Sequence, residues 1–203
     1  MAPYDYSGAP PQRSFDLIPH GTVADLSLHI QPGNAGPGGI LKRSKDGSVE
    51  MLSIEWTVVA GEHKSRKLWS NLVVEGGTTA GHAQAIDISR DVLKAIIDCA
   101  KGLDPNDNSD AARAVRTLDY ADFDGLTVVA RIGIEKGVLK PDGSGDHWPD
   151  KNVLLEVITK GRKDWHSVEP VSPFNGGGNG GRAGAQASAP INTAPPITRP
   201  DWA

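Results

Sequence analysis

The sequence predicts a mainly β domain of the α+β kind, with one inserted helix and a disordered C-terminal tail. Five or six segments alternate apolar and polar residues or are rich in β-branched residues, which is typical of strands. One segment, residues 89–102, has helical periodicity and lies before the last two strands. This number and order of elements favour an OB-like, five- to six-stranded Greek-key barrel with a helix closing one end. An unrelated β-sandwich is the alternative.

The first strand is predicted at residues 23–30, where apolar residues alternate imperfectly with polar ones. The turn-forming segment 19–21 (PHG) precedes it. The segment that follows, residues 31–39 (QPGNAGPGG), is a turn-rich loop. The dipeptide Asp46-Gly47 then suits the tight turn of a β-hairpin.

The centre of the predicted fold is a hairpin formed by residues 52–73. Its first run, 52–58, alternates apolar and polar residues with the period of a half-buried strand. Its second run, 66–73, follows a short, basic turn. Parity puts Trp56 on the face of Leu52, Ile54 and Val58, and puts Trp69 on the face opposite Leu68 and Leu72. We therefore expect Trp56 in the core and Trp69 to be the more exposed ring.

The helical segment has recognisable ends. Ser89 is a good N-cap, and Gly102 stands where a C-terminal cap belongs. A shorter helix is predicted within residues 105–118. The last two strands are predicted at 126–135 and 151–158, joined by a polar loop.

The chain divides into three parts. Residues 1–14 are rich in Pro, Gly and Tyr and are predicted to form a flexible arm. Residues 15–173 form the domain. Residues 174–203 are of low complexity and contain too few apolar side chains to offset the entropy of ordering, so we expect them to be disordered.

Charge and composition narrow the classes of function. The net charge is −4 and the pI is near 5.8, which argues against a uniformly basic, histone-like binder. Residues 42–73 contain six basic and four acidic residues, whereas 87–124 contain five basic and nine acidic ones. The hairpin is thus locally basic and the helical region acidic.

Cys99 is the sole cysteine, which excludes an intramolecular disulfide. With no apolar leader or long apolar run, we expect no membrane association and a cytoplasmic protein.

No arrangement of residues supports catalysis. The six histidines are scattered, and the chain has no phosphate-binding loop and no nucleophile elbow. Asp142, Asp146, His147 and Asp150 lie close together in sequence, but without the spacing of an EF-hand loop. We interpret that segment as a solvated turn, with a metal-dependent enzyme as a remote alternative. We expect a non-catalytic protein without a cofactor.

The hairpin brings tryptophans and cations close together, which is the combination that stacks bases and follows phosphates of single-stranded nucleic acid. The alternative is that the rings are core and the cations merely solvated. The stacking candidates are Trp56, Trp69 and Trp148. The candidates for backbone contacts are Lys64, Arg66, Lys67, Arg131, Lys151, Arg162 and Lys163.

Four segments occur in an order that resembles a phage-encoded, single-stranded-DNA-binding-like family associated with recombination and replication genes. They are FDLIPHGTV, IEWTVVAGEHKSRKLWSNLVV, ISRDVLKAIIDCA and WPDKNVLLEV, and they span residues 15–157. The resemblance implies an OB-like fold that coats or guides single-stranded DNA in a bacterial host cell. It also implies phage replication or recombination proteins as partners, and it is compatible with a homo-oligomer.

The tail departs from the pattern that the resemblance implies. Single-stranded-DNA-binding proteins often end in an acidic, aromatic tip, whereas this chain ends in TRPDWA. Trp202 is the candidate partner-binding residue there. The alternative function is an accessory module that docks on a phage recombinase or nuclease through its acidic segment 87–124 and its tail.

Overall fold

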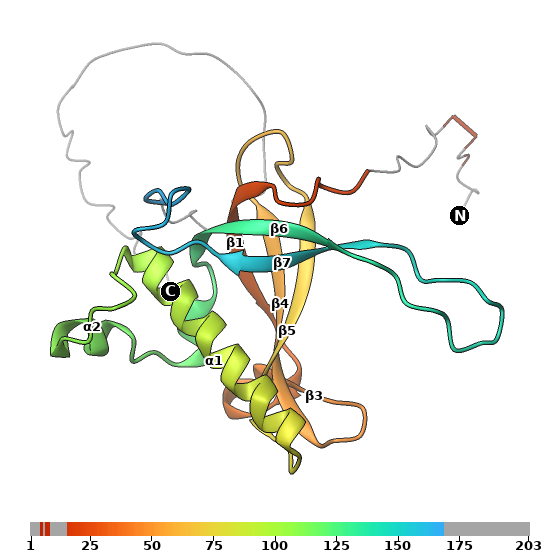
Figure 1. Cartoon of the computed structure of the whole chain (residues 1–203). Coiled ribbons are helices and arrows are strands. Elements are labelled where there is room, and N and C mark those ends of the chain that lie inside the picture. Colours follow the sequence, from red (N-terminus) through yellow and green to blue (C-terminus); the bar gives the residue numbers. More distant parts are fainter. Residues whose placement is uncertain (1–4, 6, 9–15, 169–203) are drawn as a thin grey trace, which may run out of the picture.

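The computed structural model describes residues 5, 7, 8 and 16–168 of the 203-residue chain. Most of the predicted N-terminal arm and the whole of the predicted tail, including Trp202, lie outside the described residues. Within them, the protein has a mainly antiparallel β architecture with one long helix packed on the sheet (Figure 1). The predicted mainly β class is therefore confirmed.

The sheet contains five main strands and two short ones, all paired antiparallel. The main strands run in the spatial order β5-β4-β1-β6-β7. The short β2–β3 pair extends β4 on the β1 side. The strands are β1 (Val23–Gln31), β2 (Asn34–Ala35), β3 (Leu41–Arg43), β4 (Val49–Val58), β5 (Lys67–Gly76), β6 (Thr127–Glu135) and β7 (Lys151–Val157).

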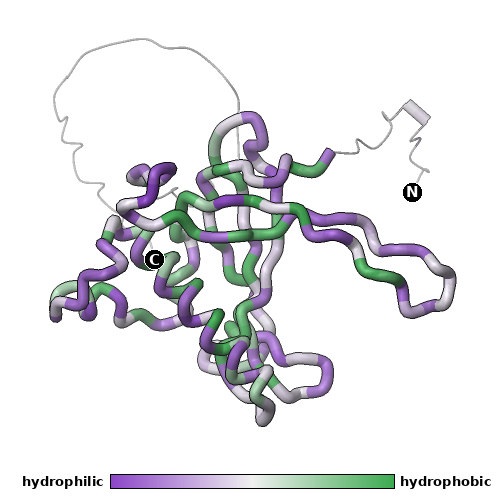
Figure 2. The backbone as a smooth tube through the Cα atoms, in the orientation of Figure 1, coloured by the Kyte–Doolittle hydropathy of each residue, from purple (hydrophilic) through white to green (hydrophobic). Residues whose placement is uncertain are grey.

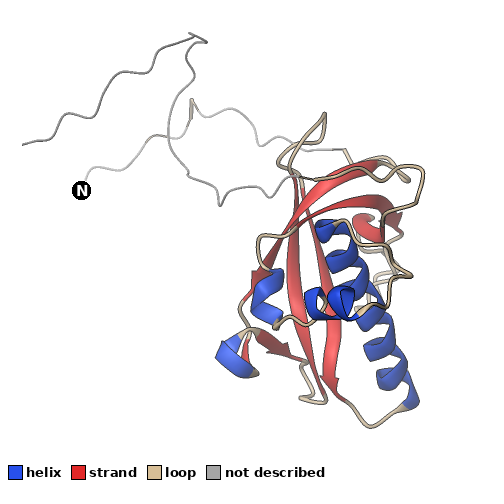
Figure 3. Cartoon of the chain, turned by 90° about the vertical axis from the view of Figure 1, so that its left-hand side faces the viewer, coloured by secondary structure: helices blue, strands red, loops and turns tan. Residues whose placement is uncertain are grey.

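The sheet is not closed. In the described part of the chain, the edge strands β5 and β7 approach each other but share no hydrogen-bonded ladder. The sheet is strongly bent in Figure 3, where the long strands curve around the helices. The structure thus confirms the strands and their antiparallel pairing but does not show the closed barrel.

The hydrophobic core follows from the two-residue period of the strands. On β4, the side chains of Leu52, Ile54, Trp56 and Val58 are all buried on one face. Apolar residues of β1 and β6, such as Leu26 and Val128, pack into the same cluster. In Figure 2 the apolar segments accordingly lie along the central strands and the inner side of the helix.

The long helix α1 (Ala80–Lys101) packs against β5, β6 and β7. It begins well before the position expected from Ser89. Thr79 is the N-cap, and its hydroxyl oxygen accepts a hydrogen bond from the backbone N–H of His82. Ser89 lies inside the helix and donates to the carbonyl oxygen of Ala85. The first turns lack an apolar stripe, so the periodicity could not reveal them. The predicted C-terminal cap is confirmed, because Gly102 has a φ of 63°.

The polypeptide between α1 and β6 is tied back to α1. It contains α2 (Asp110–Val115) and the 3-10 helix η2 (Tyr120–Phe123); a second 3-10 turn, η1 (Pro37–Gly39), lies in the loop after β2. The buried carboxylate of Asp98 accepts hydrogen bonds from Lys94 Nζ at 2.8 Å and Arg116 Nε at 2.6 Å. Arg116 also donates to the carbonyl oxygens of Asp104 and Asp107. The buried carboxylate of Asp98 thus attaches the segment between α1 and β6 to α1 through Arg116.

Candidate nucleic-acid interface

The candidate site is the outer face of the β4–β5 hairpin, opposite the core. The strand register pairs Ser53 with Asn71, Glu55 with Trp69, and Thr57 with Lys67. Because directly opposed residues of antiparallel strands project on the same side, these six side chains share one surface. We call this surface the Trp69 face; its members are Ser53, Glu55, Thr57, Lys67, Trp69 and Asn71.

Trp69 is the large apolar side chain of this surface, and 61% of it is exposed. Its neighbours on the face are polar or charged. A large ring surrounded by polar residues, and not by other apolar side chains, contributes little to a hydrophobic core. It does present an open π-surface, which is the property required for stacking on a nucleic-acid base.

Trp56 lies on the opposite side of the same hairpin and is fully buried. Its indole N–H donates a hydrogen bond of 2.8 Å to the hydroxyl oxygen of Ser70. The assignment of Trp56 as a base-stacking residue is therefore wrong, because its ring is enclosed by the core. Its placement in the core by strand parity is correct.

The exposed surface continues from the Trp69 face onto β1. The register of β1 on β4 pairs Gln31 with Ser53, His29 with Glu55, and Ser27 with Thr57. His29 is exposed, and its Nδ1 atom lies 2.9 Å from a carboxylate oxygen of Asp124. These side chains were not among the sequence candidates, because the sequence does not reveal which strand lies beside β4.

Cations lie at both ends of this surface. At one end, Lys42 of β3 is exposed and paired with Met51, which in turn is paired with Val73. At the other end, Lys67 is exposed and its Nζ lies 2.5 Å from Glu55 Oε1. The distance along β4 from Met51 to Thr57 is about 20 Å at 3.3 Å per residue. This length matches about six stacked nucleotides at 3.4 Å each.

The turn between β4 and β5 extends the basic end. Lys64 is exposed there, and it forms no ion pair with a described residue. Arg66 is half-buried, and its guanidinium donates a hydrogen bond of 2.6 Å to the carbonyl oxygen of Asp16. Ser65 has a φ of 69°, and its N–H donates to the carbonyl oxygen of Val58, which closes the turn. Lys64 is thus held on an ordered turn, and Arg66 joins that turn to the N-terminal segment.

The remaining sequence candidates do not join the Trp69 face. Arg131 pairs with Glu156 and Asp164, both at 2.9 Å, and Arg162 pairs with Glu156 at 3.0 Å. These ion pairs hold the segment after β7 against β6 and β7. Their assignment to a common phosphate track with Lys64 is not supported, because their guanidinium groups are held in ion pairs on β6 and in the segment after β7.

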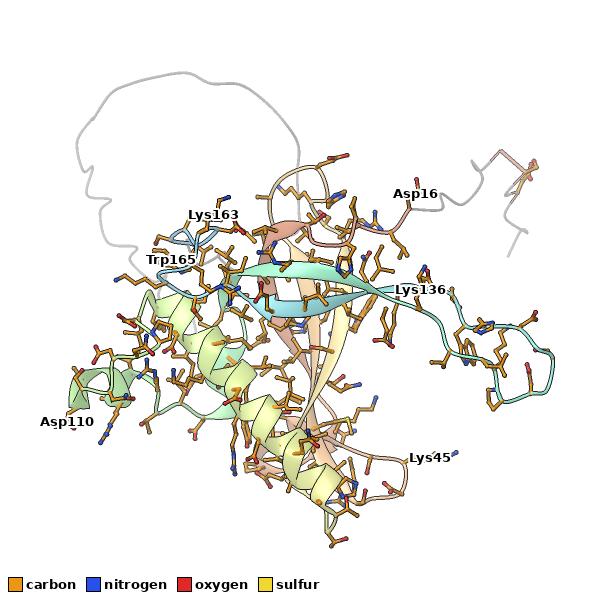
Figure 4. All side chains as sticks on the ribbon, in the orientation of Figure 1. Asp16, Lys45, Asp110, Lys136, Lys163 and Trp165 are labelled. Carbon is orange, nitrogen blue, oxygen red and sulfur yellow. The ribbon has the colours of Figure 1, made fainter. Side chains whose placement is uncertain are left out.

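Two lysines of the same candidate group also lie away from the hairpin. Lys151 pairs with Glu135 Oε1 at 3.2 Å across the β6–β7 ladder. Lys163 is exposed in the segment after β7, and Figure 4 shows it near Trp165, toward the opposite end of the β6–β7 pair from Lys136. Trp165 itself is partly buried against the core cluster.

Trp148 is 53% exposed, but it lies on the projecting segment between β6 and β7 and not on a strand of the sheet. Lys140 Nζ lies 5.7 Å from the centre of its ring, within the range of a cation–π interaction. Trp148 and Trp69 therefore come from different elements of the fold.

The described residues include no cluster of three or more His, Cys, Asp or Glu side chains arranged to hold a metal ion. Asp142 accepts hydrogen bonds from Ser144, which lower the pKa of its carboxyl group. Asp150 instead binds Lys136 Nζ and the N–H of Gly137, and these contacts lower its pKa. The two carboxylates thus stabilise turns of the projecting segment.

Within the described residues there is no helix with the length and apolarity needed to span a membrane.

Comparisons of the chain with protein-family models, with curated proteins and with solved structures found no match. The functional argument consequently depends on the chemistry of the surface itself.

Proposed function

We propose that this protein binds single-stranded DNA without catalysis, along the Trp69 face of an OB-like domain. The observation that carries the proposal is the exposed ring of Trp69 on a polar sheet surface with lysines at both ends. Aromatic stacking provides base contacts that tolerate any sequence, and the lysines provide contacts to phosphates. Double-stranded DNA buries its base faces, so this combination favours single strands.

The order of the strands supports the OB-like part of the proposal. β1, β4 and β5 follow one another as neighbours, α1 comes next, and β6 returns to pair with β1 before β7. In five-stranded, partly open Greek-key barrels of the OB type, the second and third strands and two flanking loops form the binding surface for oligonucleotides. β4 and β5 occupy those two positions here. The β2–β3 loop and the 136–150 segment correspond to the flanking loops.

Glu55 adds a condition to the proposal. Its carboxylate lies beside Trp69 and pairs with Lys67. An incoming phosphate competes with Glu55 for Lys67, so binding exchanges one ion pair for another. We therefore expect Lys64 and Lys42 to contribute more to the salt dependence than Lys67. We place this activity in phage DNA replication or recombination, the setting implied by the resemblance of the sequence segments.

A titration of fluorescently labelled oligo-dT with the full-length protein tests the proposal. With three phosphate contacts, affinity should fall about 40-fold between 50 and 300 mM salt, since each contact contributes a slope of about −0.7. Quenching of Trp69 fluorescence, measured as the difference between the wild-type protein and the Trp69→Phe variant, should accompany binding. Equal binding at both salt concentrations, or unchanged affinity of Trp69→Ala, would contradict the proposal.

The same preparations separate the proposal from an accessory docking module. That alternative predicts no oligonucleotide binding, together with partner proteins that remain bound after nuclease digestion of an extract. A DNA-binding protein instead loses partners held through DNA when the nucleic acid is digested.

A further inference from the structure

His29 belongs to the same row of side chains as Trp69. The strand register pairs His29 with Glu55 on β4, and Glu55 is paired in turn with Trp69 on β5. Two strand spacings across the sheet place His29 about 10 Å from Trp69. The side chain of His29 is 58% exposed. One strand of DNA laid across this row therefore contacts both rings.

A shared carboxylate oxygen fixes the state of the His29 ring. Asp124 Oδ1 accepts a hydrogen bond of 2.7 Å from the backbone N–H of Ile30 and lies 2.9 Å from His29 Nδ1. An ionised carboxylate only accepts hydrogen bonds, so Nδ1 is the donor of the second one. The hydrogen bond at one ring nitrogen sets the protonation of the other. Nε2 of the neutral ring thus keeps its lone pair, and it has no partner in the described part of the chain.

This arrangement gives the exposed Nε2 atom opposite roles in the two protonation states. In the neutral ring it is a hydrogen-bond acceptor, which repels the oxygen atoms of a phosphate. In the protonated ring it is a donor, and it can form a charge-assisted hydrogen bond with a phosphate oxygen. Histidine is the side chain whose charge ordinarily changes between pH 5 and 8. The ring is therefore a phosphate contact in its protonated state alone.

The neighbouring charges favour the same distinction. The charged groups that face His29 are Asp124, from the segment after η2, and Glu55, from β4. On the far side of Glu55, Lys67 of β5 binds its carboxylate at 2.5 Å. One lysine and two carboxylates give this row a net charge of −1 while His29 is neutral, and protonation of His29 brings the charge to zero. Acidification thus removes the net repulsion between this row and a phosphate.

We propose that His29 is a phosphate contact of the Trp69 face that acts only when it is protonated, so that binding of single-stranded DNA takes up a proton. This inference rests on the proposed function, because it assigns a further contact to the same surface. Affinity for single-stranded DNA then rises as the pH falls from 8 to 6. The direction follows from linkage: DNA that binds the protonated ring more tightly favours protonation, and protonation favours DNA binding by the same factor.

Titration of labelled oligo-dT with the full chain at pH 6 and pH 8, at constant ionic strength, tests the contact. Thymine does not titrate in this range, so a change in affinity comes from the protein. The wild-type protein should bind about three- to fivefold more tightly at pH 6, the effect expected of one exposed charge pair. His29→Gln should bring this ratio close to one. His29→Arg, which is charged at both pH values, should bind at pH 8 about as tightly as the wild type binds at pH 6.

His166→Gln is the matched control. His166 is likewise exposed and lies 2.8 Å from an aspartate oxygen, that of Asp25, but it belongs to the segment after β7. This variant should keep the wild-type ratio, and it corrects for the general effect of acidification on a chain with six histidines. Circular dichroism at both pH values verifies that each variant is folded. Isothermal titration calorimetry in two buffers of different ionisation enthalpy should show proton uptake that His29→Gln loses.

The outcomes separate this contact from the proposed function. Absence of oligonucleotide binding at both pH values contradicts the proposed function, and the contact with it. Binding that is equally tight at pH 6 and pH 8, or a wild-type ratio in His29→Gln, overturns the contact alone. The contact is also overturned if His63→Gln removes the ratio, because the proton is then taken up on the turn between β4 and β5.

Discussion

The indole N–H of Trp56 donates a 2.8 Å hydrogen bond to the hydroxyl oxygen of Ser70, the residue directly after Trp69. Ser70 therefore faces the core, and Trp69 must face the solvent, since successive side chains of a strand alternate between faces. A single hydrogen bond thus links the interior of the domain to the orientation of the proposed binding surface. The two tryptophans have separable roles, which mutations can test.

The first prediction concerns stability. Trp56→Ala should lower the free energy of unfolding by about 3–5 kcal/mol, because it leaves a large cavity in the core. Trp69→Ala should change it by about 0.5 kcal/mol or less, as is usual for exposed positions. Urea denaturation followed by circular dichroism measures both values. Equal losses from the two substitutions would show that the rings share one environment.

The second prediction concerns DNA affinity. Trp69→Ala should weaken binding of oligo-dT by about 5- to 150-fold, which corresponds to the 1–3 kcal/mol of one stacked base. Trp69→Phe should retain most of the affinity. Ile88→Ala provides the control, because Ile88 is an exposed apolar residue of α1, which packs against the core and not on the Trp69 face. An equal loss in Ile88→Ala would contradict the assignment of Trp69 as the stacking residue.

The third prediction concerns the salt dependence of binding. Lys64→Ala should reduce the slope of log K against log salt by about 0.7, the contribution of one phosphate contact on a single strand. Arg162→Ala should leave that slope unchanged, because Arg162 pairs with Glu156 at 3.0 Å on another part of the surface. Fluorescence anisotropy at four salt concentrations measures both slopes. If Arg162→Ala reduces this slope more than Lys64→Ala does, the phosphate contacts lie beside β6 and β7 and not on the hairpin.

The fourth prediction concerns the buried carboxylate of Asp98. Asp98→Ala should cost about 3–5 kcal/mol of stability, because Arg116 and Lys94 lose their shared partner in a largely buried site. Asp87→Ala removes an exposed helix pair with Arg90 and should cost about 0.5 kcal/mol or less. Thermal and urea unfolding of both variants distinguishes these effects, and similar values would mean that Asp98 is not the tie between α1 and α2.

The fifth prediction concerns the turn before β4. The hydroxyl of Ser44, with further bonds from Ser48, lowers the pKa of Asp46 from 3.8 to about 2. A carboxyl group whose pKa is lowered by folding stabilises the folded state above its ordinary pKa. That contribution should therefore disappear as the pH falls from about 4 to 2. In Ser44→Ala, carbon-detected NMR titration should show the pKa of Asp46 moving back toward 3.8. Ser144→Ala, which affects Asp142, is the control and should leave Asp46 unchanged.

Much of the fold was predictable from local patterns. The alternation in residues 52–58 predicted both the strand β4 and the burial of Trp56. Gly102 predicted the end of α1, because a left-handed cap strongly favours glycine. The start of α1 was not predictable in this way: residues 80–88 are helical through a Thr79 cap and contacts with the sheet, without an apolar stripe of their own.

The prediction of a polar, solvated loop at residues 136–150 is confirmed, since the segment contains no strand and most of its residues are exposed. Local patterns did not reveal that backbone hydrogen bonds join its two sides and leave Val138, Leu139 and Trp148 exposed. Backbone pairing between two polar segments has no strong signature in side-chain hydrophobicity, so the periodicity did not reveal it.

The sequence by itself determined which face of the hairpin each tryptophan occupies, because a strand repeats every two residues whatever its neighbours are. Only the tertiary structure decided which cations share the surface of Trp69. Lys42 reaches that surface through the pairing of β3 with β4, whereas Arg131 and Arg162 are drawn into ion pairs with Glu156. Strand order and register depend on contacts between residues far apart in the chain, and local periodicity carries no information about them.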